Sequence, residues 1–162
     1  SLYNSMSKFV IYIKVEPFIK QWLIHSFGNP VVFPAQSIEN STIRRFTQKQ
    51  PNAIPLPAGQ DEVAIAIPDS KAKDPIIYNY LSTYGKKAVA ECINDTFRLN
   101  MWAELNDLSD VGCSVMTAIY SWCEMHGISV DYAWTIRQRY YRMRDSYLKK
   151  GIDLRRKKRV HD

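Results

Sequence analysis

The chain has 162 residues, enough for one domain or a small domain with an appendage, and 46% of them are hydrophobic. Four Trp, ten Tyr and six Phe supply large apolar surfaces, which excludes an intrinsically disordered chain apart from the tail. No apolar run reaches the ~18 residues needed to cross a bilayer. The start lacks the basic and then apolar pattern of a signal peptide. We therefore expect a soluble, folded protein with no membrane partner.

The positive charge is concentrated at one end of the chain. Residues 130–162 carry eleven Lys or Arg and four Asp, a net charge of +7, whereas residues 1–129 carry eleven Lys or Arg and twelve Asp or Glu, a net charge of −1. Charge segregated in this way is typical of an end that faces a polyanion.

The cysteines and histidines indicate neither disulfides nor a metal. Cys92, Cys113 and Cys123 form a sparse, odd set, which favours a reducing, cytoplasmic compartment. Each lies beside apolar residues in a helical pattern, as a small buried hydrophobic residue does. A metal site would need ligands at closer spacing, and none of the histidines has such a partner. We expect no metal and no cofactor.

The first part of the chain predicts an α/β unit over 6–70. Phe9–Val15 alternates with period two, as a strand with one apolar face does. Pro17 fits the first turn of a helix that ends at Gly28. Val31–Phe33 lies between prolines, which favours an edge strand. Val63–Ile67 predicts a second clear strand.

Between these strands, Ser37 is placed to cap a helix that runs to about Thr47. Residues 48–60 contain several prolines and predict a loop near the upper length for compact domains.

The second part predicts a helical unit over 74–150. Asp74 caps a helix expected over 75–84, and a longer helix follows over 86–108. Ser109 is placed to cap a third helix over 110–125. The longer helix carries an apolar stripe at every fourth position, which predicts deep burial: Val89, Ile93, Phe97, Met101 and Leu105.

The segment that follows resembles the general helix-turn-helix pattern over about twenty residues. Gly127 supplies a turn position with positive φ, and the small residue Cys123 lies four positions before it. Ile128 provides the apolar residue after the glycine, and Ala133 and Ile136 face the first helix. A hairpin at 110–150 is therefore expected.

Two features depart from that pattern. His126 occupies a position where an apolar residue is common, and the second helix, over about 130–150 with Ser129 as its cap, is long for a recognition helix. An ordinary helical hairpin in the core would satisfy much of the same pattern.

The second helix has an apolar seam and a basic remainder. Its seam follows 3-4-3-4 spacing through Ala133, Ile136, Tyr140, Met143 and Tyr147. Arginine outnumbers lysine on the remaining faces, which suits bidentate contacts with phosphate or guanine. The basic run of the flexible tail at 151–162 extends this surface, although such a tail can also serve only solubility. The residues assigned to nucleic-acid binding are Thr135, Arg137, Gln138, Arg139, Tyr141, Arg142, Arg144, Lys149, Lys150, Arg155, Arg156, Lys157, Lys158 and Arg159.

No enzyme motif is present. The sequence lacks GxSxG, P-loop and GxGxxG patterns. Asp69 and Lys71, after the second strand, resemble a fragment of a metal-dependent nuclease core, but no second carboxylate accompanies them. We assign no catalytic residue.

The sequence as a whole predicts a mostly helical α+β protein, with a small N-terminal sheet and its helices followed by a helical half that contains the helix-turn-helix-like unit. The leading hypothesis is a nucleic-acid-binding protein, with double-stranded DNA as the target and a prokaryotic or mobile-element regulator as the type. The N-terminal unit would form a homodimer or bind a partner through the Phe9–Val15 edge. Two alternatives stay open: a Tyr/Arg-rich helix that docks an acidic protein, and RNA as the target.

Overall fold

The computed structural model describes residues 9–51, 59, 61–110 and 114–151, with the side chains of 109 and 110 excluded. It is a mostly helical α+β fold, as predicted. The chain forms two compact units that divide between Phe97 and Arg98, and each is described by itself. Within the described ranges, no helix is both long and apolar enough to cross a membrane.

The sheet of the first unit is built on β3 (Glu62–Ala66). β1 (Val10–Lys14) pairs antiparallel with one edge of β3, with Ile11 opposite Ile65. On the other edge Val31 makes a single parallel bridge, in which its N–H donates to the Ala64 carbonyl at 2.8 Å. The strand expected over 31–33 is limited to this bridge, because the next N–H donates to Phe27 instead.

Helix α1 (Pro17–Phe27) begins and ends where the sequence predicts. Its first residue is the proline, and the N–H of Gly28, at φ 87°, donates to the Ile24 carbonyl at 2.9 Å. The buried Trp22 ring contacts the Phe97 ring edge-on, with centroids 5.3 Å apart. Trp22 and Phe97 thus add an aromatic contact to a core that is mainly aliphatic.

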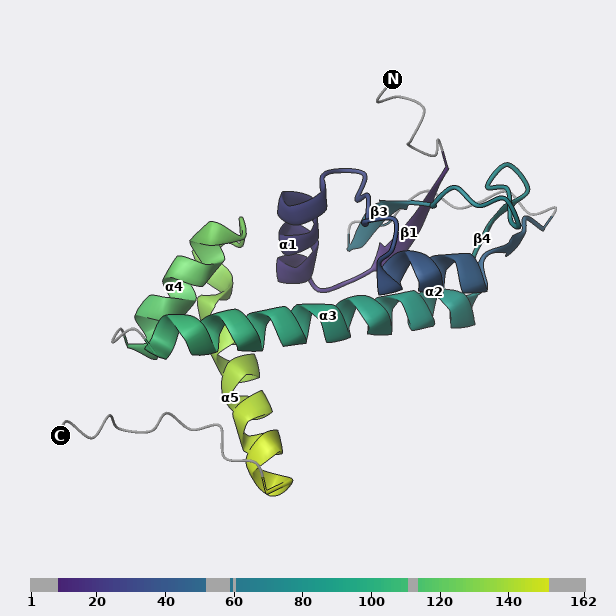
Figure 1. The fold of residues 1–162 in the computed structure, drawn as a ribbon. Helices are drawn as coiled ribbons and strands as arrows, with labels where there is room; N and C mark the ends of the chain where they lie inside the picture. Colours follow the sequence, from purple (N-terminus) through teal and green to yellow (C-terminus); the bar gives the residue numbers. More distant parts are fainter. Residues whose placement is uncertain (1–8, 52–58, 60, 111–113, 152–162) are drawn as a thin grey trace. The chain divides into compact units, whose positions relative to one another are not determined.

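Helix α2 (Ile38–Phe46) starts at the predicted cap, because the Ser37 hydroxyl accepts a hydrogen bond from the Asn40 N–H at 3.1 Å. Figure 1 shows α2 alongside the first part of α3, where the Thr96 hydroxyl donates to the buried Glu39 carboxylate at 2.6 Å. The buried Glu39 carboxylate thereby has a hydrogen-bond partner inside the unit.

The prediction of a helix over residues 75–84 is wrong. Asp74 and Pro75 form only one turn, in which the Asp74 carboxylate accepts from Ile76 N–H at 3.0 Å. The Asn79 amide donates to carbonyls within this turn, and the chain then enters β4 (Tyr78–Tyr80). β4 pairs antiparallel with β2 (Gln48–Lys49), a strand inside the predicted loop. Strand pairing has overridden a local helix-start signal.

Helix α3 (Thr83–Asp110) is continuous, and Ser82 caps it. Gly85 lies in the first turn of α3 and does not interrupt the helix. A Cβ at Gly85 would lie 3.2 Å from the Phe46 Cβ and 3.1 Å from a Leu81 methyl, so the glycine permits close packing. The stripe predicted at every fourth position is buried throughout.

The second unit contains the last part of α3, α4 (Val115–Met125), a short 3-10 turn η2 (Val130–Tyr132) and α5 (Ala133–Lys149). The predicted cap at Ser109 is wrong, because that residue lies inside α3. Ser114 caps α4 instead, and its hydroxyl accepts from Thr117 N–H at 3.2 Å.

The end of α2 depends on a lysine distant in sequence. Lys73 Nζ donates to the carbonyl oxygens of Arg44 at 2.9 Å, Arg45 at 3.1 Å and Thr47 at 2.9 Å. The Arg44 carbonyl also accepts from the Thr47 hydroxyl at 3.3 Å. Carbonyls at the end of a helix have no intrahelical N–H to accept from, and a cation there also interacts favourably with the helix dipole.

Replacing Lys73 by Met removes all three donors and the charge. We expect the free energy of unfolding to fall by about 1–2 kcal/mol, with faster amide hydrogen exchange in the last turn of α2. Lys71→Met is the matched control, since Lys71 is exposed on the same segment. Equal stability of the two variants would show that this cap contributes nothing.

Candidate nucleic-acid interface

The turn between α4 and α5 has the geometry that its sequence predicts. Gly127 adopts φ 67°, and the Ile128 N–H donates to the Cys123 carbonyl at 2.9 Å while the Gly127 N–H donates to Glu124 at 3.4 Å. This pair of bonds is the Schellman motif that ends helices at a glycine. Cys123 and Ile128 are both buried, and burial raises the pKa of the Cys123 thiol to about 11.

The second helix starts three residues later than the sequence predicts. Ser129 does act as a cap, accepting from Asp131 N–H at 3.3 Å, but the turn that follows is η2 and the α-helix begins at Ala133. Tighter 3-10 turns are frequent at helix N-termini, and here one joins the glycine turn to α5.

One side of α5 is held in the core of the unit. Ala133 and Ile136 are fully buried and Tyr140 nearly so. The Tyr140 ring stacks on Trp102 from α3, with centroids 4.9 Å apart and planes 19° apart; Tyr147 lies 6.0 Å from the same indole. The predicted seam is thus buried along its first half, and the residues of α5 outside the seam are half-buried or exposed.

A row of alternating aromatic and basic side chains follows one flank of α5. The Arg137 guanidinium carbon lies 5.3 Å from the Trp134 ring centroid and 4.9 Å from that of Tyr141. The Arg144 guanidinium carbon lies 4.4 Å from the Tyr141 centroid. These are cation–π distances, and the 3-4-3 spacing places the four residues on one flank. We name this set, Trp134, Arg137, Tyr141 and Arg144, the arginine–aromatic ladder.

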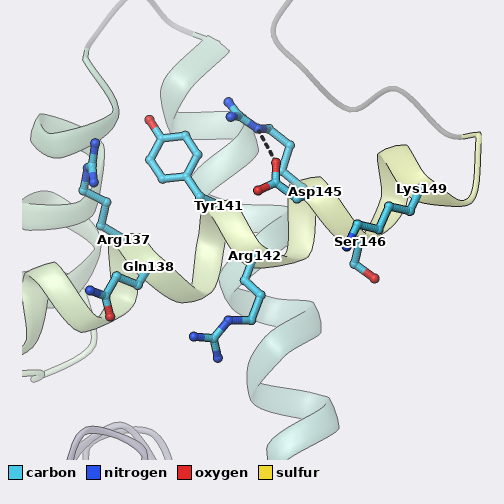
Figure 2. A pocket seen from close by; sticks show the side chains of 8 residues that line it. Arg137, Gln138, Tyr141, Arg142, Asp145, Ser146 and Lys149 are labelled. Carbon is cyan, nitrogen blue, oxygen red and sulfur yellow. Dashed lines mark ion pairs between the residues drawn. The ribbon is translucent and has the colours of Figure 1, made fainter.

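The ladder borders an open hollow on the solvent side of α5, shown in Figure 2. Gln138, Arg142 and Lys149 line the hollow and are exposed. Asp145 also lines it and lies 3.9 Å from Arg144 Nε. Basic groups therefore dominate this surface, with one carboxylate among them.

The remaining predicted binding residues lie around the same helix. Thr135 and Arg139 are half-buried, and Lys150 is exposed at the end of α5. Thus α5 brings together every predicted binding residue that lies within the described ranges. The predicted tail residues are outside them: Arg155, Arg156, Lys157, Lys158 and Arg159.

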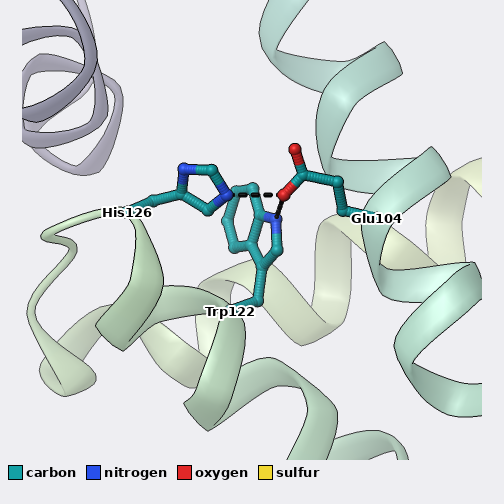
Figure 3. A network of polar contacts seen from close by, with 3 residues as sticks. All are labelled: Glu104, Trp122 and His126. Carbon is teal, nitrogen blue, oxygen red and sulfur yellow. Dashed lines mark hydrogen bonds and ion pairs between the residues drawn. The ribbon is translucent and has the colours of Figure 1, made fainter. Parts of the chain in front are cut away.

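A polar network that the sequence does not reveal joins the turn between α4 and α5 to α3. The carboxylate of Glu104 on α3 accepts from the Trp122 indole N–H at 2.8 Å, and His126 Nε2 is hydrogen-bonded to the same oxygen at 2.5 Å (Figure 3). The histidine in the turn therefore has a polar partner. Eighteen and 22 residues separate these partners in sequence, so no local spacing signals the contact.

Within the part of the chain that the structure describes, no group of three His, Cys, Asp or Glu side chains is placed to hold a metal ion. Comparison with known proteins gives no family model, curated protein or solved structure that matches this chain. The geometry of α5 is therefore the basis on which a function is inferred.

Replacing Glu104 by Ala leaves the indole N–H of the fully buried Trp122 without its acceptor. An unsatisfied buried donor costs about 1–3 kcal/mol, and we expect urea unfolding, followed by circular dichroism, to shift accordingly. Asp107→Ala removes the same charge from an exposed position on α3 and serves as the control. If both variants unfold alike, the network does not support the hairpin.

Proposed function

We propose that this protein binds nucleic acid, and double-stranded DNA in particular, through the solvent faces of α5. The observation that carries the proposal is the charge of this helix. Residues 133–150 hold six basic side chains and one acidic one, and the apolar seam leaves the basic ones outside the core. Such a surface neutralises backbone phosphates and displaces their counterions.

The type of cation supports phosphate contact. Four of the six are arginines, at 137, 139, 142 and 144, and the planar guanidinium forms two parallel hydrogen bonds to one phosphate. The major groove of B-DNA admits an α-helix. If α4, the glycine turn and α5 act as a helix-turn-helix, the exposed Gln138 and Arg142 are the side chains we assign to base edges, with Thr135 beside them.

The N-terminal unit supplies the dimer in this proposal. Phe9 and Val15 make backbone hydrogen bonds on the β3 side of β1, so antiparallel alternation directs the backbone groups of Val10, Tyr12 and Lys14 to the opposite edge. Pairing of this edge with a second copy would give the twofold arrangement that DNA-binding regulators use on two half-sites. The regulator role, of prokaryotic or mobile-element type, depends on that dimer.

A second candidate is docking of an acidic protein, and one observation favours it. Met125, Val130 and Trp134, around the turn into α5, have exposed fractions of 56%, 57% and 59%. Exposed apolar side chains beside arginines and tyrosines are typical of protein interfaces. Phosphate contact alone gives them no role.

Fluorescence anisotropy of a labelled duplex of ~30 base pairs tests the proposal. The full chain and a chain ending at Leu148 are titrated at about 50 and 200 mM salt, where affinity based on phosphate contacts falls by orders of magnitude. We expect the full chain to bind and the shortened chain to bind more weakly but measurably, because most of the α5 cations remain.

The other outcomes contradict parts of this account. If all binding is lost on shortening, α5 itself carries no contact. If neither chain binds at low salt, the nucleic-acid proposal is wrong and an acidic protein becomes the partner to test. Single-stranded DNA and RNA as competitors show which form of nucleic acid is preferred.

A further inference from the structure

The two arginines of the ladder share one aromatic ring. Arg137 lies one helical turn before Tyr141 and Arg144 one turn after it, and both guanidinium carbons lie within 4.9 Å of the ring centroid. Cation–π stacking uses the face of the guanidinium. The N–H donors lie in its plane and point outward from its edge, so stacking leaves them able to bind an anion.

One donor in the ladder makes no hydrogen bond. Arg144 Nε is buried, and it makes no hydrogen bond in the structure. The Asp145 carboxylate forms an ion pair with this nitrogen at 3.9 Å, a separation beyond hydrogen-bonding distance (Figure 2). A buried polar group without a hydrogen bond is uncommon in folded proteins. The Arg144 side chain is 30% exposed through its other atoms, so an incoming anion reaches those atoms rather than Nε, and the surrounding basic groups favour an anion there.

We propose that the ladder is a preformed phosphate-binding site, an inference that rests on the nucleic-acid function proposed above. Arg137 and Arg144 donate to the backbone phosphate from their edges. Tyr141 orders both guanidinium groups, and its hydroxyl, at the outer end of the ring (Figure 2), is a further donor. Side chains ordered before binding lose less conformational freedom when the complex forms, which strengthens binding without adding charge.

The proposal predicts that variants of unchanged charge lose affinity. Tyr141→Leu removes the ring that orders both arginines. We expect duplex affinity to fall about tenfold, because the two arginine side chains would then have to be ordered when the complex forms. Tyr141→Phe keeps the ring and should stay within about threefold of the original affinity. Arg144→Lys keeps the charge but loses the planar fork, so its affinity should also fall.

Matched controls come from the same unit. Tyr120→Leu makes the same change at an exposed tyrosine on α4, and Arg98→Lys changes an exposed arginine on α3. Circular dichroism checks that helix content is unchanged in each variant. In NMR spectra of the full chain, the Arg144 Nε–H signal should shift on adding duplex or inorganic phosphate, but not on adding chloride.

Each outcome decides the proposal. If Tyr141→Leu and Arg144→Lys bind duplex as the original chain does, the cations act as diffuse charge; the site is refuted while the nucleic-acid function stands. If the original chain binds no duplex, both fail. Poly-glutamate is the competitor that separates phosphate binding from carboxylate binding. If poly-glutamate displaces the duplex at equal charge concentration, and Tyr141→Leu weakens poly-glutamate binding as much as duplex binding, the site binds an acidic protein.

Discussion

The packing of Tyr140 on Trp102 is the contact on which the surface of α5 depends. With Ala133 and Ile136 buried beside it, this stack fixes which side of the helix faces the core of the unit. Because a helix returns to the same face every 3.6 residues, the remaining positions then lie on the flanks or toward solvent. The arginines occupy those positions, where burying their charge would be costly.

The start of α5 is positioned by a second set of contacts. The glycine turn closes α4 with two backbone hydrogen bonds, and Glu104 ties Trp122 and His126 to α3. The sequence pattern described above more often has an apolar residue than a histidine at this position, and the hydrogen bond to Glu104 gives the His126 ring a polar partner. The turn is therefore held by both a backbone motif and a polar network.

Local pattern predicts the structure well where the core agrees with it. The period-two strands, the glycine turn and the stripe through Ile93 and Met101 follow from apolar spacing and are confirmed. Asp74 and Pro75 carry every local sign of a helix start, yet pairing of Tyr78–Tyr80 with Gln48–Lys49 overrides them. The contacts of Glu104 were not predictable because they join distant segments. The ladder was predictable in principle, since its members recur every three or four residues.

We propose that nucleic acid meets the solvent faces of α5, and mapping of amide chemical shifts tests this most directly. A ¹⁵N-labelled chain is titrated with duplex DNA at low salt, and its spectrum is followed residue by residue. We expect the perturbed amides to cluster at exposed positions from Trp134 to Lys149, with the strands β1 and β3 unchanged. Perturbations centred on the strands, or none along α5, would contradict the account.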